Sequence, residues 1–204
     1  MANRGIAEVL HFTTSRGVLG VLHTGALKAR QRLATDKQLQ YILKVNAASR
    51  EKDSDWLDYV NLSIGRINSW FFDISSGKWH VADDLFWAVL AFDVEILSHD
   101  DVYFTTTNNI YTGVKRARGA KGIEGMFAPK IVRWTGNVVV RDAGQRDNEP
   151  TCLQAEVLYP KQVLLKYLRT IYVRKDDEED ELSAQLAITR NQRINIVTEP
   201  EIFA

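Results

Sequence analysis

Cysteine and net charge are the two things this sequence lacks. Of its 204 residues only Cys152 is a cysteine, and 26 Lys and Arg side chains are balanced by 26 Asp and Glu. A single cysteine excludes an internal disulfide and a zinc site built from several cysteines. Zero net charge excludes a surface that attracts nucleic acid everywhere. A local basic groove is still allowed, because charges act within about 8 Å in physiological salt.

Membrane and export signals are also missing. No stretch approaches the ~20 apolar residues of a transmembrane helix, and residues 1–7 lack the apolar run of a secretory signal. We therefore expect a soluble, cytoplasmic protein. Hydrophobic residues make up 45% and charged residues 25% of the chain, the usual mixture for a folded protein. A chain of this length predicts a single domain, residues 1–204.

The hydrophobic patterns predict a mixed α and β fold. Residues 59–64 (Y-V-N-L-S-I) alternate, which places Val60, Leu62 and Ile64 toward a core and the intervening side chains on the other face. Gly25 follows a helical pattern where a left-handed cap would end the helix. The same criteria predict strands over residues 9–13, 59–64, 87–92, 102–107, 151–158 and 171–173, and helices over 17–25, 36–46, from Pro160 onward and from Asp176 onward.

Residues 108–150 show little periodicity, and a stretch that long is usually functional or mobile. Its first part combines glycines with four cationic residues, Lys115, Arg116, Arg118 and Lys121. Such a cluster favours contacts with nucleic-acid phosphates and salt-dependent binding, although an ordinary charged loop has the same composition. Three aromatic residues are candidates for stacking on bases, with core packing the commoner role for the tryptophans: Trp79, Tyr111 and Trp134.

Polar side chains recur on the face opposite the apolar residues in three distant segments. They are His11 with Thr13, the residues Tyr59, Asn61 and Ser63, and Gln154 with Glu156. Each alone is more often the solvent face of a strand, but the three together form a more specific pattern. The remaining histidines lack metal-ligand spacing, so no metal site is predicted.

Taken in order, these segments resemble the DarT family of DNA ADP-ribosyltransferase toxins. The resemblance covers about residues 9–173. Its motifs are His11-x-Thr13 before a helix over 17–25, Arg50 upstream of residues 59–64, the F-T-T-T-N segment at 104–108, and Q-A-E-V-L at 154–158. It implies an α+β fold, the ADP-ribosyltransferase-like split β-sandwich with surrounding helices, whose cleft holds NAD⁺.

The resemblance also implies roles for individual residues. Glu156 and Arg50 would be catalytic. NAD⁺, as co-substrate and without a metal, would be held by His11, Thr13, Arg50, Tyr59 and Ser63. DNA would be contacted by Asn108, Lys115, Arg116 and Arg118, in a substrate-recognition loop at about 108–150 that precedes the glutamate, and by Gln154. A fixed carboxylate suits this chemistry, because breaking the nicotinamide–ribose bond develops positive charge on the ribose.

The implied substrate is a base in single-stranded DNA, because pairing in a duplex hides the attacking nitrogen. Thymidine-modifying members read more like F-T-D-G-H where this chain has F-T-T-T-N, and they carry an asparagine near Gly17. These departures favour guanosine, with thymidine still open. Such an enzyme would be the toxin of a toxin–antitoxin or phage-defence system, neutralised by a macrodomain-type ADP-ribosyl hydrolase. The alternatives are transfer onto RNA or protein, and a catalytically idle NAD⁺ or nucleic-acid binding module.

Overall fold

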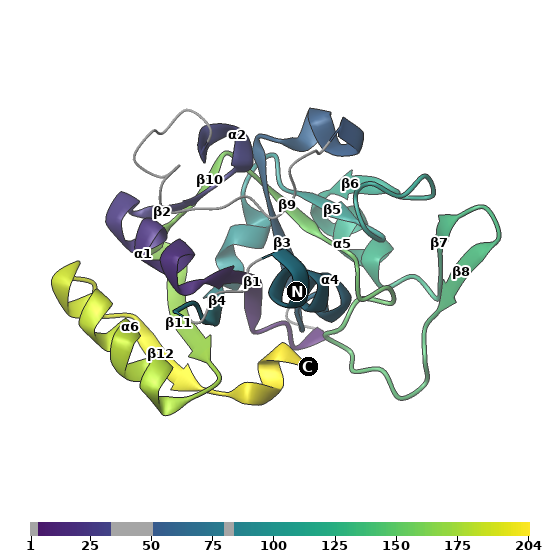
Figure 1. Ribbon diagram of the computed structural model, residues 1–204. Coiled ribbons are helices and arrows are strands. Elements are labelled where there is room, and N and C mark those ends of the chain that lie inside the picture. Colours follow the sequence, from purple (N-terminus) through teal and green to yellow (C-terminus); the bar gives the residue numbers. More distant parts are fainter. Residues whose placement is uncertain (1–3, 34–50, 80–83) are drawn as a thin grey trace.

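The computed structural model describes residues 4–33, 51–79 and 84–204 of the chain (Figure 1). An eight-stranded sheet runs through the molecule in the order β12-β11-β4-β1-β3-β9-β5-β6. Neighbouring strands pair antiparallel except β11 and β12, which are parallel. The strands are β1 (Glu8–Thr14), β3 (Tyr59–Ile64), β4 (Trp87–Asp93), β5 (Tyr103–Thr105), β6 (Arg116–Arg118), β9 (Val157–Pro160), β11 (Leu168–Val173) and β12 (Asn195–Thr198).

The sheet consists of two halves that meet at a short junction. β1 pairs with β4 along its whole length, but its pairing with β3 is limited to Val9 with Ile64 and Leu10 with Ser63. Beyond Leu10 the two strands no longer pair residue by residue, so backbone groups of β3 facing β1 need other partners. The eight-stranded sheet is therefore continuous but has its shortest run of pairing within the central strands between β1 and β3.

Helices flank the sheet in Figure 1, with α4 in front of its centre and α1 and α6 to one side. The described helices are α1 (Ser15–Thr24), α2 (Arg30–Leu33), α4 (Ser69–Ile74), α5 (Gly119–Met126) and α6 (Asp176–Ile188). A π turn, η3 (Ser75–Trp79), follows α4, and 3-10 turns form η2 (Glu51–Trp56), η4 (Val94–Ser98), η5 (Leu165–Tyr167) and η6 (Pro200–Phe203). None of the helices in the described ranges is long and apolar enough to cross a membrane.

Two small sheets complete the fold. β2 (Ala26–Lys28) pairs with β10 (Gln162–Leu164), and β7 (Lys130–Trp134) forms a hairpin with β8 (Asn137–Val140). The β7–β8 hairpin extends away from the main sheet at one edge of the molecule (Figure 1).

The core has two parts, one on each face of the sheet. β4 contributes to both, because Leu90 packs in the larger cluster with Val9 and Leu62, whereas Val89 packs in the smaller one with Phe72. This explains why residues 87–92 form a continuous apolar run, since a strand buried on both faces has no polar side. The alternation predicted for residues 59–64 is confirmed in β3, whose buried residues are Val60, Leu62 and Ile64.

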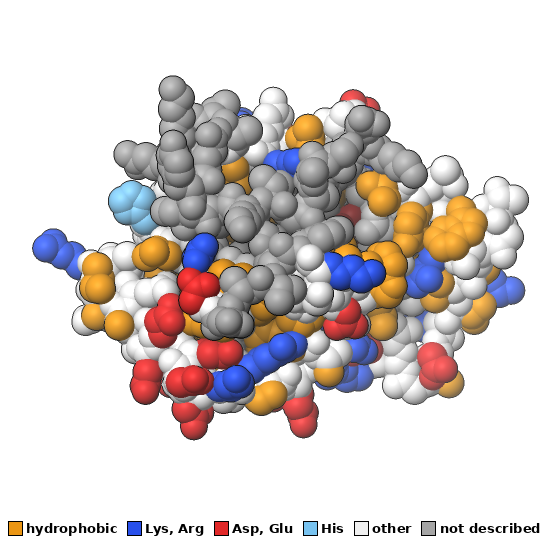
Figure 2. All heavy atoms as spheres, in the orientation of Figure 1, with side chains coloured by type: hydrophobic (Ala, Val, Ile, Leu, Met, Phe, Trp, Pro, Cys, Tyr) orange, Lys and Arg blue, Asp and Glu red, His pale blue; other side chains and the backbone are white. Residues whose placement is uncertain are grey.

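One predicted end of each of two helices is confirmed, the end of α1 at Gly25 and the acidic start of α6. α1 ends at Gly25, which has a φ of 72°, and Thr14 caps its start by accepting the Gly17 N–H at 3.2 Å. α6 begins with four acidic residues in its first turn, which the helix dipole favours. Acidic side chains gather at the lower left of Figure 2, over this helix.

Other sequence predictions were wrong. Only residues 157–158 of the predicted strand 151–158 belong to β9, because residues 151–154 form bends and turns, and Cys152, predicted on the polar face beside Glu156, is fully buried. No helix begins at Pro160, because the chain turns at Lys161 (φ 64°) and residues 162–164 pair with β2. Residues 108–150 contain β6, α5, β7 and β8 instead of one irregular loop. The helix predicted over 36–46 lies outside the described residues.

Candidate active site

Glu156 is held at the start of β9 by contacts from two other parts of the chain. Asn61 Nδ2 on β3 donates to Oε1 at 3.0 Å, and the Asn109 N–H donates to Oε2 at 2.8 Å. The Glu156 N–H donates to Thr105 Oγ1 at 2.8 Å, and the Thr105 N–H donates to the Glu156 carbonyl at 2.9 Å. The half-buried carboxylate is thus oriented by side chain and backbone together.

His11 bridges the gap where β1 and β3 stop pairing. Its Nδ1 lies 2.9 Å from the Asn61 carbonyl oxygen. A carbonyl only accepts, so Nδ1 carries the hydrogen and the neutral ring has its lone pair on Nε2. Burial lowers the pKa of His11 below its ordinary value, and the hydrogen bond to Asn61 offsets only part of this effect. The structure therefore places a neutral imidazole beside the residue that holds Glu156.

Thr13 and Ser63 lie on the two strands that form this junction. Thr13 is half-buried and packs against the first turn of α1, where a Cβ at Gly17 would overlap its Oγ1. Ser63 is half-buried and follows Leu62, the partner of Val157 in the β3–β9 ladder, so it flanks the position of Glu156. Thr13 thus lies two residues beyond His11 on β1, and Ser63 lies two residues beyond Asn61 on β3. Arg50 lies outside the described residues.

An aromatic cluster with two arginines lies beside the carboxylate. The rings of Trp56, Tyr59 and Tyr103 contact one another with centroids 5.0–6.0 Å apart. Arg116 lies over Trp56 and Arg118 lies over Tyr103, each 5.1 Å from the ring centroid. Burial is the main reason that the pKa of Tyr59 is raised above its ordinary value. We call these five side chains the aromatic–arginine cluster.

The residues predicted to contact DNA occupy different environments. Lys115 is exposed, while its backbone pairs with Thr106 through two hydrogen bonds of 3.0 and 3.1 Å. Arg118 is exposed and forms an ion pair with Asp101. Asn108 shapes a turn, in which its Oδ1 accepts the Ile110 N–H at 3.1 Å.

Arg116 contacts the site itself, through a residue that the sequence analysis missed. Its Nε donates to Asn109 Oδ1 and its Nη2 donates to the Asn109 carbonyl, both at 2.6 Å. Asn109 is in turn the residue whose N–H holds Glu156. The only sequence signal for it is the pair of adjacent asparagines in the segment that follows β5.

Gln154 links the site to the β7–β8 hairpin. Its buried side chain accepts a hydrogen bond from Tyr111 Oη at 3.1 Å, and the Tyr111 ring meets Trp134 edge-on at 5.0 Å. Trp134 is 41% exposed, so the core position expected for it is wrong; the side chain of Trp79 lies outside the described part. Three further exposed side chains of the hairpin are apolar, Val132, Val138 and Val140. Apolar side chains gather at the right of Figure 2, over this region.

The segment between the hairpin and Glu156 has no regular secondary structure, but several hydrogen bonds and an ion pair hold it in place. Arg141 donates to the carbonyls of Glu149 and Arg146, both at 2.8 Å. Arg146 forms an ion pair with the buried Glu149 carboxylate at 2.6 Å. Thr151 donates through its hydroxyl to the Ala128 carbonyl at 2.7 Å. These contacts hold a chain without regular structure in one conformation.

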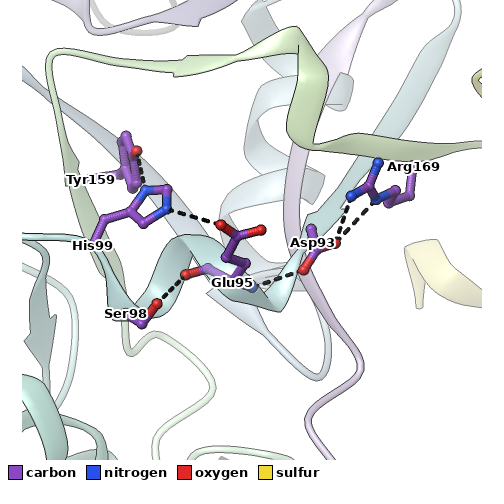
Figure 3. Close-up of polar contacts among 6 residues, drawn as sticks. All are labelled: Asp93, Glu95, Ser98, His99, Tyr159 and Arg169. Carbon is purple, nitrogen blue, oxygen red and sulfur yellow. Dashed lines mark hydrogen bonds and ion pairs between the residues drawn. The ribbon is translucent and has the colours of Figure 1, made fainter.

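A second polar cluster surrounds η4, at the far end of β4 (Figure 3). Arg169 donates twice to Asp93, at 2.8 and 3.1 Å, and His99 Nδ1 lies 2.7 Å from Tyr159 Oη. The pKa of Asp93 is lowered, first by the Glu95 N–H and then by Arg169. These contacts join η4 to β9 and β11, so we interpret the cluster as structural.

Metal ligands do not cluster in the described ranges. Among residues 4–33, 51–79 and 84–204, no group of three or more His, Cys, Asp or Glu side chains is arranged to hold a metal ion. The Cys152 thiol is buried between Thr107 Oγ1 at 3.2 Å and Arg133 Nε at 3.4 Å.

Comparison with known families decides between the possible uses of such a carboxylate. The family model described as "ssDNA thymidine ADP-ribosyltransferase, DarT" matches residues 10–204. The chain belongs to the DarT family. The resemblance inferred from the motifs is thereby confirmed, as is the predicted enzyme class, and the match extends beyond residue 173 to the end of the chain.

Solved structures agree on the fold. Thermus sp. 2.9 DarT in complex with carba-NAD⁺ has a TM-score of 0.68 and 13% identity over 98% of this chain and 99% of that one. The complex of Thermus sp. 2.9 DarT with ADP-ribosylated ssDNA has a TM-score of 0.65 and 15% identity, with 97% and 96% covered. Thermosipho africanus DarTG in complex with ADP-ribose has a TM-score of 0.60 and 16% identity over 97% of this chain but 51% of that one. These likenesses confirm the α+β, ADP-ribosyltransferase-like fold. Among curated proteins, none matches the chain by sequence.

Proposed function

We propose that this protein transfers ADP-ribose from NAD⁺ to thymidine in single-stranded DNA, with Glu156 as the catalytic carboxylate. One observation carries the proposal: in a chain of the DarT family, the Glu156 carboxylate is held by Asn61 Nδ2 at 3.0 Å and by the Asn109 N–H at 2.8 Å. Two donors from separate segments fix its direction before any substrate binds. A preorganised charge of this kind is usually the largest contribution to lowering a barrier in which charge develops.

The chemistry asks two things of Glu156. NAD⁺ supplies the ADP-ribosyl group, and the bond between ribose and nicotinamide breaks as the bond to the base nitrogen forms. The carboxylate stabilises the positive charge that develops on the ribose. It also accepts the proton that the attacking nitrogen loses, which a carboxylate within hydrogen-bond reach can do.

Four described residues are proposed to hold NAD⁺: His11, Thr13, Tyr59 and Ser63. The lone pair on His11 Nε2 can accept a hydrogen bond, because Nδ1 is committed to the Asn61 carbonyl. Arg50 is proposed to bind the pyrophosphate and to take part in catalysis, on the family motif alone. Guanidinium groups suit that role because they bind phosphate in a two-pronged geometry.

Thymidine is the proposed base because the family description that matches residues 10–204 names it. The F-T-T-T-N segment favoured guanosine, so the two bases are compared directly in the test below. For DNA we propose contacts from Asn108 and the exposed cations Lys115 and Arg118 in the recognition segment 108–150, and from Gln154 just after it. Because the reaction consumes NAD⁺ and modifies DNA, we expect the protein, as a single domain over residues 1–204, to act in the cytoplasm.

Modification of DNA bases is harmful to a cell, so we propose that the protein is the toxin of a toxin–antitoxin or phage-defence system. Thermosipho africanus DarTG, a structural relative, is about twice as long as the part that this chain matches. The proposed partner is an antitoxin of the macrodomain hydrolase type. Co-expression with such a hydrolase should restore growth that expression of the active protein alone arrests.

The test uses labelled NAD⁺ with four single-stranded DNA oligonucleotides, each enriched in one base, followed by digestion and identification of the modified nucleoside by mass. We expect the parent protein to modify thymidine. We expect Glu156→Gln to leave almost no modification. A guanosine adduct would overturn the choice of base. Label found on an RNA oligonucleotide or on protein would favour those substrates instead. NAD⁺ that is neither consumed nor incorporated would indicate an idle binding module.

A further inference from the structure

Arg116 stands at the end of a chain of contacts that leads to the catalytic carboxylate. It lies on β6 opposite Thr105 of β5, the residue that binds both backbone groups of Glu156. Its guanidinium donates from Nε and Nη2 to the side chain and to the carbonyl of Asn109, both at 2.6 Å. The Asn109 N–H then donates to Glu156 Oε2 at 2.8 Å.

The geometry suits positioning. A guanidinium is planar and presents its donors in a rigid fork, so two bonds to one residue fix that residue in both position and orientation. Arg116 is exposed as a residue, but its guanidinium lies over the Trp56 ring, 5.1 Å from the ring centroid, which adds a third contact to the two hydrogen bonds. Asn109 is only 2% exposed, so its backbone has little freedom once both of its oxygens are bound.

We propose that Arg116 is a positioning residue that aligns the Glu156 carboxylate through Asn109. Resting on the proposed function of Glu156, this inference replaces the phosphate contact that the loop composition predicts for Arg116. A misplacement of about 1 Å at a reacting group costs up to about a hundredfold in rate, so the effect of disturbing Asn109 should be measurable.

Arg116→Lys is the informative substitution, because it keeps the positive charge and removes the fork. Lysine carries one compact ammonium group on a flexible stem and does not reproduce the two-donor geometry. The kcat of DNA modification should fall about tenfold to a hundredfold. The KM for DNA and its dependence on salt should stay at the values of the parent protein. If Arg116 instead contacts a DNA phosphate, lysine keeps that contact as a point charge, so kcat would stay at the parent value and any loss would appear in KM.

Asn109→Ala tests the middle of the chain. It removes the Oδ1 that accepts from Arg116 Nε but keeps the N–H that donates to Glu156, so kcat should fall with KM unchanged. Because both residues act through the same carboxylate, the double variant should lose little more than the more damaging single variant. If the fold-loss in kcat of the double variant equals the product of the two single fold-losses, the two residues act separately, and the proposed chain of contacts is wrong.

Arg169→Lys is the matched control, because Arg169 also donates two hydrogen bonds to one residue, Asp93, in the cluster of Figure 3 away from Glu156. It should lose no kcat. If the parent and this control do not modify DNA, the proposed function fails. If they do, and Arg116→Lys keeps the parent kcat or loses activity through KM and salt dependence, the positioning role is wrong. If Arg116→Lys has a lower Tm than Arg169→Lys, its loss of activity could come from unfolding, and the kcat of Asn109→Ala becomes the deciding measurement. A kcat of Asn109→Ala equal to that of the parent protein would then overturn the proposal.

Discussion

Glu156→Gln isolates the charge of the catalytic carboxylate from its shape. The parent carboxylate accepts from Asn61 Nδ2 on one oxygen and from the Asn109 N–H on the other. Glutamine keeps one acceptor and replaces the other with a donor. Its oxygen must face the Asn109 N–H, which is fixed to the backbone, so its NH₂ group faces Asn61. The Asn61 side-chain amide can rotate to present its own oxygen, and the hydrogen-bonding pattern can then be restored.

The consequences for stability and for rate therefore differ. Two bonds to a charged group are exchanged for two neutral ones, which costs about 1 kcal/mol of stability and lowers Tm by about 2–4 °C for a chain of this size. Loss of the charge that faces the ribose should cost on the order of 10²–10³ in rate, or about 2.7–4 kcal/mol of barrier. The substitution should thus yield a folded and nearly inactive protein.

Single-turnover transfer from labelled NAD⁺ to a thymidine-rich oligonucleotide measures the rate, and a thermal melt measures the fold. Glu156→Asp is the comparison variant, because it keeps the negative charge but its shorter side chain moves the carboxylate away from Asn61 and Asn109. It should lose activity for a geometric reason. If Glu156→Gln modifies DNA within about tenfold of the parent rate, the charge is not what lowers the barrier, and the assignment of Glu156 is refuted.

Three other predictions test the site around the carboxylate. Arg50→Ala should raise the KM for NAD⁺ more than Arg50→Lys, because a point charge replaces only part of a two-pronged contact with pyrophosphate; equal KM values in all three proteins would place Arg50 outside the site. Because the pKa of His11 is lowered by burial, the folded protein binds its proton less tightly than the unfolded chain does. Stability should therefore fall as pH drops below about 6.5, and His11→Gln should flatten that part of the curve of Tm against pH. Gly17→Ala would drive a Cβ into Thr13 Oγ1 and should cost about 1–3 kcal/mol in denaturant unfolding, whereas Gly77→Ala, which meets no atom within 4 Å, should cost nothing measurable.

Patterns that reflect burial were readable from the sequence. The two-residue alternation of β3 records a strand with one buried face, and the apolar run of β4 records a strand buried on both. Gly25 marked the end of α1 because its φ of 72° is one that glycine adopts without strain. In each case, one local property of the side chains decides the local structure.

The segments around Glu156 were harder to predict because tertiary contacts shape them. Residues 153–157 alternate like a strand, yet backbone groups before β9 bond elsewhere: the Thr151 N–H donates to the Met126 carbonyl at 2.9 Å. After Pro160, pairing of residues 162–164 with β2 overrides the helical spacing. Neither partner is near in sequence, so no local pattern records the contact.

The polar residues of the site also fall into two groups, those with a local sequence pattern and those placed by tertiary contacts. His11, Asn61 and Glu156 were found because they are polar residues in strand patterns, where the expected position of each side chain is readable. Asn109 was missed because what it gives Glu156 is a backbone N–H, a group that every residue except proline carries. Arg116 was assigned to DNA because a cation between glycines has the composition of a phosphate-binding loop, whereas its contacts depend on the pairing of β5 with β6.

The stretches between β5 and β6 and between β8 and β9 illustrate how irregular backbone can serve catalysis when its groups are held in place. Electrostatic stabilisation works when the donors around the charge do not have to reorganise as the reaction proceeds. The Asn109 N–H meets this condition because Arg116 holds both oxygens of that residue, and the chain after the β7–β8 hairpin is held by Arg141 through two carbonyls at 2.8 Å. Regular hydrogen bonding along these stretches would not place an N–H group against a side chain on another strand. Irregular backbone does so where Arg116 holds the stretch between β5 and β6 and Arg141 holds the stretch after β8.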